Sequence, residues 1–516
     1  MSKLIKDIVI IGGGTAGWLT AGILSSKLKS RVQSGELSIT LCESPNIPIV
    51  GVGEGTWPTM PETLRSLGIS ETDFIRECDV SFKQGSKFVG WGNEQSSGSY
   101  VHPFDLPEFG LDGFLAHQWN SNLYPHSFAQ TFTTQENLGD AGLAPKTIST
   151  AEYAKYANYG YHLNATKFST FLQKHCVKHL NIKHILAEVE DVKLATSGQI
   201  TSVYLAGKGD LTGDLFIDCT GFKSLLLGES LGVKFKKVDD ILFADTALAT
   251  HVDYTNNQSP IASFTLSTAQ RAGWIWDIGL PCRRGVGYVY SSQYTDHQTA
   301  TQDLHQYIKS SSSNVKNIET REIKFTAGHR ELFWKENCVA VGLSAGFLEP
   351  LEASAIVLVE LSAAMIAEQL PNTHDELPIR AKRFNQKFNY HWSRAIEFLK
   401  LHYLVSERST SFWQDNRAEA SVPERLKELM QLWQYDVPKY SDFEQGGELF
   451  QAASYQFVLY GSAFRSRPTY QLDPRLDQLI DKQIKDNQAK TAQLLNGLPT
   501  NRELINKIME FGLAKI

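Results

Sequence analysis

The chain has 516 residues, a formal net charge of −6 and an apolar fraction of 42%. This length favours two or three packed domains, or one large composite, over a single small core. The small negative charge provides no basic surface, so we expect no nucleic-acid partner. No apolar run approaches the roughly 18 residues of a membrane-spanning helix, so we expect no membrane segment.

The six cysteines are scattered and form no CxxC or Cys/His cluster. We therefore predict no metal site and free, buried thiols, as is usual in a reducing cytoplasm. The N-terminal apolar run ends in glycines instead of a small-residue cleavage site, which indicates a strand and not an export signal. Together these features predict a cytoplasmic protein.

The first 43 residues predict a strand, a helix and a second strand. Residues 8–11 form a continuous apolar run, typical of a strand buried on both faces. A glycine-rich turn, a helical pattern over residues 18–28 and a second strand over residues 37–42 follow. Glu43 comes directly after the second strand, where a carboxylate can accept hydrogen bonds from a ribose.

The glycine-rich turn fits the pattern GxGxxG between a strand and a helix. The first glycine permits the tight turn, the second lets the backbone approach a pyrophosphate, and the third lets helix and strand pack closely. The expected dinucleotide contacts are Gly12, Gly14, Thr15, Ala16, Gly17 and Glu43.

A second strand-to-glycine turn favours FAD over NAD as the dinucleotide. An apolar strand over residues 214–217 enters the turn Asp218-Cys219-Thr220-Gly221, of the kind that flavoproteins with two dinucleotide folds use to complete the flavin site. No second GxGxxG is available for a nicotinamide. We therefore expect Asp218 to contact FAD, and the reducing equivalents to come from elsewhere.

The remaining pattern predicts an α/β chain with a Rossmann-type FAD-binding core. Strands are expected at residues 181–192, 200–205 and 339–341, and an antiparallel sheet at residues 240–290. A helix over residues 353–370 is closed by Pro371, and helices dominate from residue 375 onward. We predict a core of residues 1–374, with an inserted substrate-side sheet, and a helical cap of residues 375–516 over the substrate pocket.

Six stretches resemble the flavin-dependent halogenases of the tryptophan halogenase type. They span about two-thirds of the chain in the order of the family. They are VIIGGGTAGW at residues 9–18, IPIVGVGEGTWP at 47–58, FKQGSKFVGW at 82–91, DLFIDCTGF at 214–222, WIWDIG at 274–279 and VGLSAGFLEPLEASAI at 341–356.

The resemblance implies oxidative halogenation of an aromatic ring. In this family a separate flavin reductase supplies FADH2, and oxygen then drives the oxidation of chloride or bromide to hypohalous acid. The oxidant passes through an internal channel to a lysine beside a small aromatic substrate, where electrophilic substitution follows.

Lys83 and Glu352 match the two catalytic positions of the family. The ammonium of Lys83 can hydrogen-bond hypohalous acid, or its amine can form a haloamine, and either holds the oxidant in one place. A lone lysine is otherwise a solvated surface residue. Lys87 is the competing lysine nearby, and its neighbours Phe88 and Val89 suggest that it flanks a strand. Glu352 matches a carboxylate that orients the oxidant or takes the ring proton. Glu352 and Glu349 could instead interact with the dipole of the helix that follows.

The resemblance also assigns residues beside the flavin. Ser354 and Ala355 match the positions whose backbone amides hold the halide, although many relatives have Thr-Gly there. Leu343 and Ile356 match flavin contacts, and Val189 matches a position near the adenine end.

Trp274 and Trp276 match a WxWxIP signature whose rings separate flavin from substrate, with Gly279 in place of the proline. Two tryptophans at this spacing point to the same side of a strand. Ordinary core aromatics are the alternative interpretation of either one alone.

The substrate side matches the family less closely. His102, Phe104 and Phe450 are the expected pocket residues, whereas Gln451 stands where a second aromatic would be expected and Glu448 could contact an amine. An indole, a phenol and a larger indole-bearing molecule all remain open, and free tryptophan is disfavoured.

Two functions other than halogenation remain open. A homodimer is also possible from the sequence. A flavin hydroxylase of the same fold usually carries a Gly-Asp pair where Gly342 is followed by Leu343. A catalytically silent FAD-binding or substrate-binding protein would not need both Lys83 and Glu352. Ala355 and Gly279 depart from the family pattern and keep this second alternative open.

Overall fold

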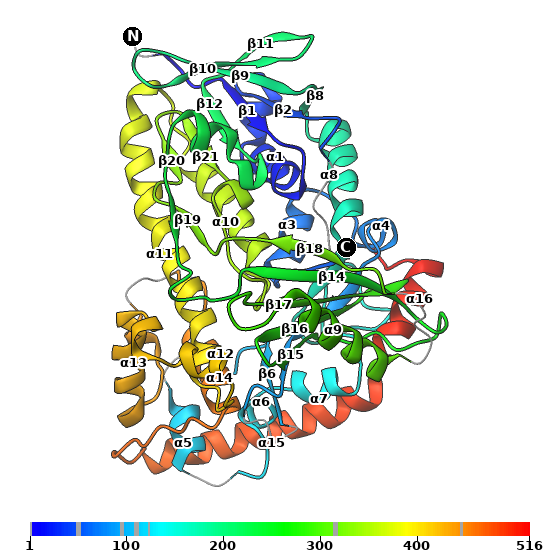
Figure 1. Ribbon diagram of the computed structural model, residues 1–516. Coiled ribbons are helices and arrows are strands. Elements are labelled where there is room, and N and C mark those ends of the chain that lie inside the picture. Colours follow the sequence, from blue (N-terminus) through cyan, green and yellow to red (C-terminus); the bar gives the residue numbers. More distant parts are fainter. Residues whose placement is uncertain are drawn as a thin grey trace.

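The computed structural model describes residues 3–47, 53–92, 98–107, 113–121, 124–312, 318–443 and 447–515. Figure 1 shows a region built on the N-terminal strands at one end, an antiparallel sheet in the middle and a layer of helices at the opposite end. The long helix α11 (Leu377–Leu404) runs along one side and connects the first region to the last.

A six-stranded sheet of mainly parallel strands forms the core of the N-terminal region. Its order is β20-β21-β12-β1-β2-β8, and only β20 and β21 pair in the antiparallel sense. The strands are β20 (Trp334–Lys335), β21 (Cys338–Ala340), β12 (Leu215–Asp218), β1 (Asp7–Ile11), β2 (Ser38–Glu43) and β8 (Lys183–Leu186). Four of the five residues of β1 are buried, as the apolar run predicts for a strand with neighbours on both sides.

Three helices pack beside this sheet and confirm the predicted Rossmann-type order. Helix α1 (Thr15–Lys27) begins directly after the glycine turn and packs against α10 (Ser354–Glu368) and α8 (Ala165–His179). The short helix α2 (Lys29–Gln33) follows α1. The predicted start of the first helix, at residue 18, is three residues late because glycine and threonine give no apolar signal.

One predicted strand is wrong. Residues 181–192 were expected to form a single strand, but one strand ends at Leu186 and a second begins at Val189. The first part is β8, which pairs with β2, and the second is β9 (Val189–Leu194), which pairs with β10 (Ile200–Leu205). Strands β9, β10 and β11 (Gly209–Thr212) form a separate meander, so the break marks a change of sheet.

The predicted antiparallel sheet over residues 240–290 is confirmed and is larger than expected. Its order is β18-β14-β17-β16-β15-β5-β6, and β5 pairs with β15 in the parallel sense. The strands are β18 (Arg321–Lys324), β14 (Thr246–Asp253), β17 (Arg283–Tyr290), β16 (Gly273–Gly279), β15 (Thr265–Gln270), β5 (Gly85–Val89) and β6 (Ser99–Pro103). Helix α9 (His297–Ser311) packs on β14 and β17.

Two small sheets complete the β structure. One has the order β3-β7-β4, with β3 (Gly53–Gly55), β7 (Gly160–Asn164) and β4 (Ser81–Lys83). The other has the order β13-β19-β22, with β13 (Phe235–Lys237), β19 (Gly328–Arg330) and β22 (Gly346–Phe347). Lys83 is the last residue of β4, so the first of these sheets sets its position.

The remaining helices lie around these sheets. Before residue 141 they are α3 (Thr59–Ser66), α4 (Glu71–Glu77), α5 (Phe114–Ser121), α6 (Phe128–Phe132) and α7 (Gln135–Asp140). After α11 they are α12 (Ser411–Asn416), α13 (Glu424–Tyr435), α14 (Ala452–Gly461), α15 (Pro474–Gly497) and α16 (Asn501–Phe511). Helices α3 and α4 lie near α1 and α8, and most of the others lie at the opposite end. Helix α14 packs on β6 and α15 on α6 and α7, whereas α16 returns to α4 (Figure 1). The domain division at residue 374 stays a prediction.

None of the described helices is long and apolar enough to cross a membrane. The described residues also contain no cluster of His, Cys, Asp and Glu suited to a metal ion. All six cysteines are free. The prediction of buried thiols holds for Cys42, Cys78, Cys176 and Cys338, whereas Cys219 is half-buried and Cys282 is exposed.

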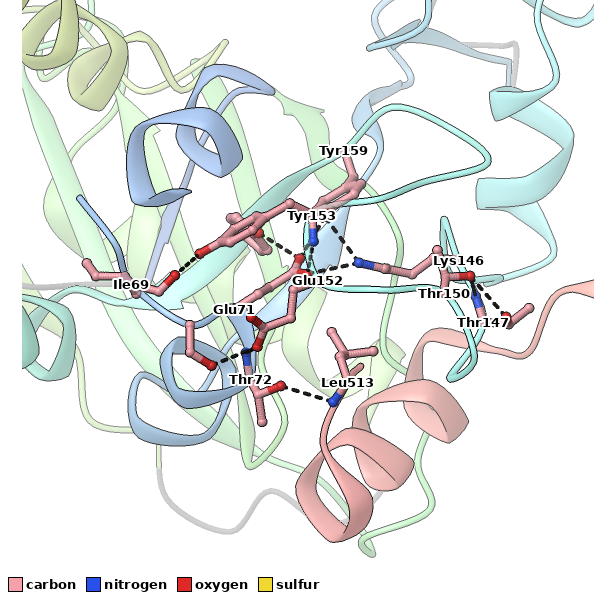
Figure 2. Close-up of polar contacts among 12 residues, drawn as sticks. Ile69, Glu71, Thr72, Lys146, Thr147, Thr150, Glu152, Tyr153, Tyr159 and Leu513 are labelled. Carbon is pink, nitrogen blue, oxygen red and sulfur yellow. Dashed lines mark hydrogen bonds and ion pairs between the residues drawn. The ribbon is translucent and has the colours of Figure 1, made fainter. Parts of the chain in front are cut away.

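A buried polar cluster gathers around Glu71 and Lys146 (Figure 2). The Glu71 carboxylate accepts hydrogen bonds from Lys146 Nζ at 2.9 Å, from the Tyr159 hydroxyl at 2.7 Å and from the Tyr161 hydroxyl at 2.8 Å. Burial lowers the pKa of Lys146, and Glu71 opposes that shift. The Phe82 ring packs edge-on against Tyr159, so the cluster supports β4 immediately before Lys83.

We expect Lys146→Met to lower the free energy of unfolding by about 3–5 kcal/mol, because it leaves the Glu71 carboxylate buried without its cation. Lys167→Met is the matched control, since it removes a half-exposed ion pair with Asp79 and should cost at most about 1 kcal/mol. Denaturant unfolding followed by tryptophan fluorescence measures both. Equal stability of the two variants would contradict the prediction.

Candidate active site

The glycine turn after β1 has the geometry of a phosphate-binding turn. Gly12 has φ +111°, and a Cβ there would lie 2.2 Å from the carbonyl oxygen of Cys219. A Cβ on Gly17 would lie 1.9 Å from the carbonyl oxygen of Gly12, so the third glycine permits the close helix–strand contact that the motif predicts. A Cβ on Gly14 would meet nothing within 4 Å. Gly14 therefore presents open backbone at the N-terminus of α1.

A cavity of about 640 Å³ extends from this turn to the N-terminus of α10. Several residues that the sequence assigned to flavin or halide line it. They are Gly12, Gly14, Thr15, Ala16, Glu43, Val189, Leu343, Ser354, Ala355 and Ile356. The structure thus brings together segments that lie more than 300 residues apart along the chain.

The lining fits a dinucleotide such as FAD. The first N–H groups of a helix have no partners within the helix, and Gly14 as N-cap supplies no side chain to satisfy them, so α1 can accept a pyrophosphate. Glu43 lies at the end of β2, where its Oε1 accepts hydrogen bonds from His184 at 2.8 Å and Gln173 at 3.2 Å. These contacts fix the carboxylate at the cavity wall, where a ribose can bind.

Asp218 differs from its predicted role as a flavin contact. It is fully buried and does not line the cavity. Its carboxylate accepts hydrogen bonds from the backbone N–H groups of Thr220, Leu226 and Leu227, at 3.0, 2.9 and 2.8 Å. Asp218 therefore holds the second glycine turn, and the cavity is lined by the neighbours Cys219 and Thr220 instead.

Lys83 lies inside the protein, directly behind the cavity wall. It is 0% exposed, and its Nζ has no hydrogen-bond partner among the described residues. A Cβ on Gly55 would be 3.2 Å from this Nζ and 3.4 Å from the Ala353 Cβ, and both Gly55 and Ala353 line the cavity. Burial lowers the pKa of Lys83 from 10.5 to about 8, and the charge of Glu352 opposes that shift. The lowering disfavours the ammonium by about 3 kcal/mol.

Glu352 is held by two histidines. Its Oε1 lies 2.9 Å from His102 Nδ1 and 3.0 Å from His402 Nε2, and His402 Nδ1 pairs with the Tyr100 hydroxyl at 2.7 Å. Burial alone would raise the pKa of Glu352, but the charge and hydrogen bond of His102, together with His402, hold that pKa well below its usual range. Glu352 is therefore a buried carboxylate, and its side-chain partners are histidines instead of the helix N-terminus.

The predicted substrate residues surround these two groups. The Phe104 ring lies 5.3 Å from Lys83 Nζ, and His102 contacts Glu352. Phe450 is 2% exposed; its ring stacks on Phe398 at 3.8 Å and meets Trp57 edge-on at 5.0 Å. Glu448 is engaged by the Tyr390 hydroxyl. The aromatic residues thus gather on the Lys83 side of the wall.

The two tryptophans of β16 have different surroundings. Trp276 lines the cavity, whereas Trp274 is fully buried and donates its indole N–H to Glu349 at 2.7 Å. The Tyr403 hydroxyl donates to the same carboxylate oxygen at 2.6 Å. Glu349 therefore anchors Trp274 instead of interacting with the dipole of α10.

Gly279 does not loosen the end of β16. It pairs with Arg284 of β17, and a Cβ there would lie 3.0 Å from Ile261 and 3.1 Å from the Tyr254 hydroxyl. The position is crowded, which accounts for glycine in this chain.

The sequence did not single out His402, Tyr100, Trp57 or His162. His402 and Glu352 lie 50 residues apart on different elements, and neither stands in a short motif with the other. Trp57 donates its indole N–H to the Glu352 carbonyl at 2.7 Å across 295 residues. Contacts of this range become visible only in the folded chain.

We expect Gly14→Ala to fold normally and to weaken FAD binding at least tenfold, since its methyl group would occupy the space that a pyrophosphate needs. Gly497→Ala is the control, because its added Cβ also meets nothing within 4 Å but lies at the end of α15. Thermal unfolding checks the fold, and calorimetric titration with FAD measures the affinity. Unchanged affinity in Gly14→Ala would contradict this placement of the phosphates.

Comparison with known proteins agrees with this site. The tryptophan halogenase family matches residues 7–478. The structure of a tryptophan halogenase from Shewanella frigidimarina NCIMB 400 superposes with a TM-score of 0.95 at 44% identity, covering 100% of this chain and 99% of the other. Tryptophan 6-halogenase SttH of Streptomyces toxytricini is 32% identical over 520 residues, or 96% of this chain and 97% of its own.

The chain is also similar to a halogenase whose name does not mention tryptophan. BrvH, a flavin-dependent halogenase from Brevundimonas sp. BAL3, superposes with a TM-score of 0.84 at 29% identity, over 98% of this chain and 99% of its own. Flavin-dependent halogenases use FADH2 and a halide, and they work with a separate flavin reductase and an aromatic substrate. The chain belongs to the tryptophan halogenase family and is a flavin-dependent halogenase, an oxidoreductase.

Proposed function

We propose that this halogenase acts on an indole-type aromatic ring, with hypohalous acid held by Lys83 and the ring proton taken by Glu352. The observation that carries the proposal is the position of Lys83: its amine is fully buried, lacks a hydrogen-bond partner in the described part of the chain and adjoins the cavity wall at Gly55 and Ala353. A cation without a protein partner is suited to binding a small polar molecule that arrives from the cavity.

The cavity residues would hold FAD and halide in defined places. The turn from Gly12 to Gly17 would bind the pyrophosphate and Glu43 the ribose, while Leu343 and Ile356 would contact the flavin. The first N–H groups of α10, at Ser354 and Ala355, would bind chloride or bromide. When bound as FADH2, the flavin supplies the reaction with oxygen that converts the halide to hypohalous acid.

Lys83 would donate a hydrogen bond from its ammonium to the oxygen of hypohalous acid. With its pKa at about 8, the side chain is mostly charged at neutral pH. Donation to the oxygen draws electron density from the halogen and fixes the oxidant beside the ring, so both reactivity and position depend on one group.

Glu352 would accept the proton that leaves the ring after halogen addition. The two histidines keep its carboxylate ionised, and they also fix its orientation. Its proton affinity is low, which suits the deprotonation of a strongly acidic cationic ring intermediate.

The substrate is proposed from the aromatic surroundings. His102, Phe104 and Phe450 lie close to Lys83 and Glu352 and provide ring faces for an indole. The relatives named above include enzymes named for tryptophan. Because Glu448 is already engaged by Tyr390, an indole or a larger indole-bearing molecule is favoured over free tryptophan. A homodimer and a cytoplasmic location stay predictions.

We expect Lys83→Met to reduce formation of halogenated product by at least about 100-fold while flavin oxidation continues, because the oxidant is made but no longer held. Lys87→Met is the matched control: Lys87 lies on β5 and pairs with Asp140 at 2.5 Å on the outer side. Reductase, NADH, FAD, oxygen, bromide and a panel of indoles are supplied, and products are measured by mass spectrometry. Selective halogenation by Lys83→Met would show that Lys83 does not hold the oxidant.

We expect Glu352→Gln to slow halogenation about 100-fold, because the amide cannot accept the ring proton. Glu360→Gln is the control, since Glu360 lies on α10, is also buried, and accepts hydrogen bonds from Thr59 and Thr63. Single-turnover product formation is compared with flavin oxidation in each variant. Equal halogenation by both variants would remove Glu352 from the reaction.

A further inference from the structure

A histidine shares the sheet face of Lys83. In the sheet β3-β7-β4, Lys83 pairs with Gly160, and His162 pairs with Gly55 on one side and Ser81 on the other. Alternate residues of a strand point to the same face, so Lys83, His162 and the two glycines lie on one face. Gly55 has no side chain, which leaves room for the end of the Lys83 side chain beside it. The Lys83 amine is therefore directed to the row of residues that contains His162.

His162 has one bound and one free ring nitrogen. It is 0% exposed; Nε2 lies 2.8 Å from the Thr265 hydroxyl, and Nδ1 is without a hydrogen-bond partner within the described ranges. Thr265 also lines the FAD cavity, as Gly55 does. His162 thus contacts a residue of the cavity lining, and it lies on the same face of the sheet as Lys83, which adjoins the lining at Gly55.

A neutral His162 can offer its free nitrogen as a hydrogen-bond acceptor. Burial, and then the charge of Lys83, hold the pKa of His162 well below its usual range, so the imidazole is neutral at pH 7. A neutral imidazole has one N–H donor and one acceptor nitrogen. When Nε2 carries the hydrogen and donates it to Thr265, Nδ1 accepts.

We propose that His162 is a second binding residue for hypohalous acid, whose O–H donates to His162 Nδ1 while the Lys83 ammonium donates to its oxygen. The inference rests on the proposed role of Lys83 and adds what a single ammonium cannot provide. One hydrogen bond leaves the halogen free to swing around the oxygen, whereas two fix the direction in which it points. No covalent bond forms or breaks in this binding step, and the proton stays on the hypohalous acid.

Two amide variants separate this role from a structural one. The side chain of asparagine places a polar atom near the Nδ1 position of histidine, whereas glutamine reaches the Nε2 position. We expect His162→Gln to keep the contact with Thr265 but to lower halogenated product per flavin oxidised at least about tenfold. We expect His162→Asn to retain most of that ratio. A role limited to tying β7 to β15 through Thr265 predicts the reverse order.

Escape of oxidant is the second measurement. Monochlorodimedone in solution traps hypohalous acid that leaves the protein, and we expect His162→Gln to increase trapping while flavin oxidation stays unchanged. His175→Gln serves as the control, since His175 is half-buried and bonds to the Leu67 carbonyl away from the site. Wild-type ratios in both His162 variants, or loss only in His162→Asn, would overturn the inference.

If both His162 variants lose product, Thr265→Val shows whether the cause is the lost contact with Thr265 or the lost Nδ1. This variant removes the Thr265 hydroxyl and keeps Nδ1 in place. A ratio near that of the wild type would support the inference, and a ratio as low as in the His162 variants would overturn it. Lys83→Met tests the proposed function separately, because selective halogenation without Lys83 would defeat that function whatever the His162 variants do.

Discussion

Lys83 is a cation inside the protein, and the way in which its surroundings tolerate that charge determines the rest of the site. Its Nζ has no hydrogen-bond partner among the described residues, and the Phe104 ring lies 5.3 Å away. Glu352 stabilises the ammonium through its charge from a distance. A direct ion pair would satisfy the amine and leave nothing for the oxidant, whereas this arrangement keeps the amine charged and available.

The same constraint explains why Glu352 needs its two histidines. A buried carboxylate is costly unless it is paired, and pairing it with Lys83 would block the amine. His102 and His402 supply the partners instead, and Tyr100 completes the chain of contacts. Behind β4, the buried pair of Glu71 and Lys146 is fully satisfied, with tyrosine hydroxyls on the remaining positions. The Glu71–Lys146 cluster has its partners within the protein and supports β4. The Glu352 cluster leaves the Lys83 amine available for a ligand.

The sequence predicted contacts between residues that lie close together along the chain better than contacts between distant residues. The glycine turn and the acid at the end of β2 belong to one βαβ unit, so spacing alone predicted that they lie together. Gly12, Gly14 and Glu43 do line one cavity, and Gly17 packs against Gly12. Lys83 and Glu352 carry no local signal that separates them from Lys87 and Glu349, and only the resemblance selected them. For Glu349 the sequence offered only an alternative role at the helix dipole, because its partner Trp274 lies 75 residues earlier, on β16. His402 and His162 were missed because their contacts depend on strand register and helix packing. No short sequence motif predicts these contacts.

Ala353 links the two sides of the wall. It has φ +54° and ψ +38°, a left-handed conformation that costs a non-glycine residue about 1–2 kcal/mol. The residue before it, Glu352, bonds to histidines on the Lys83 side, and the residues after it, Ser354 and Ala355, line the FAD cavity. The turn persists because both flanks are held: Trp57 bonds to the Glu352 carbonyl, and α10 packs on α1. Because one strained residue separates them, the carboxylate and the proposed halide-binding amides cannot move independently, and the two compartments keep a fixed relative position.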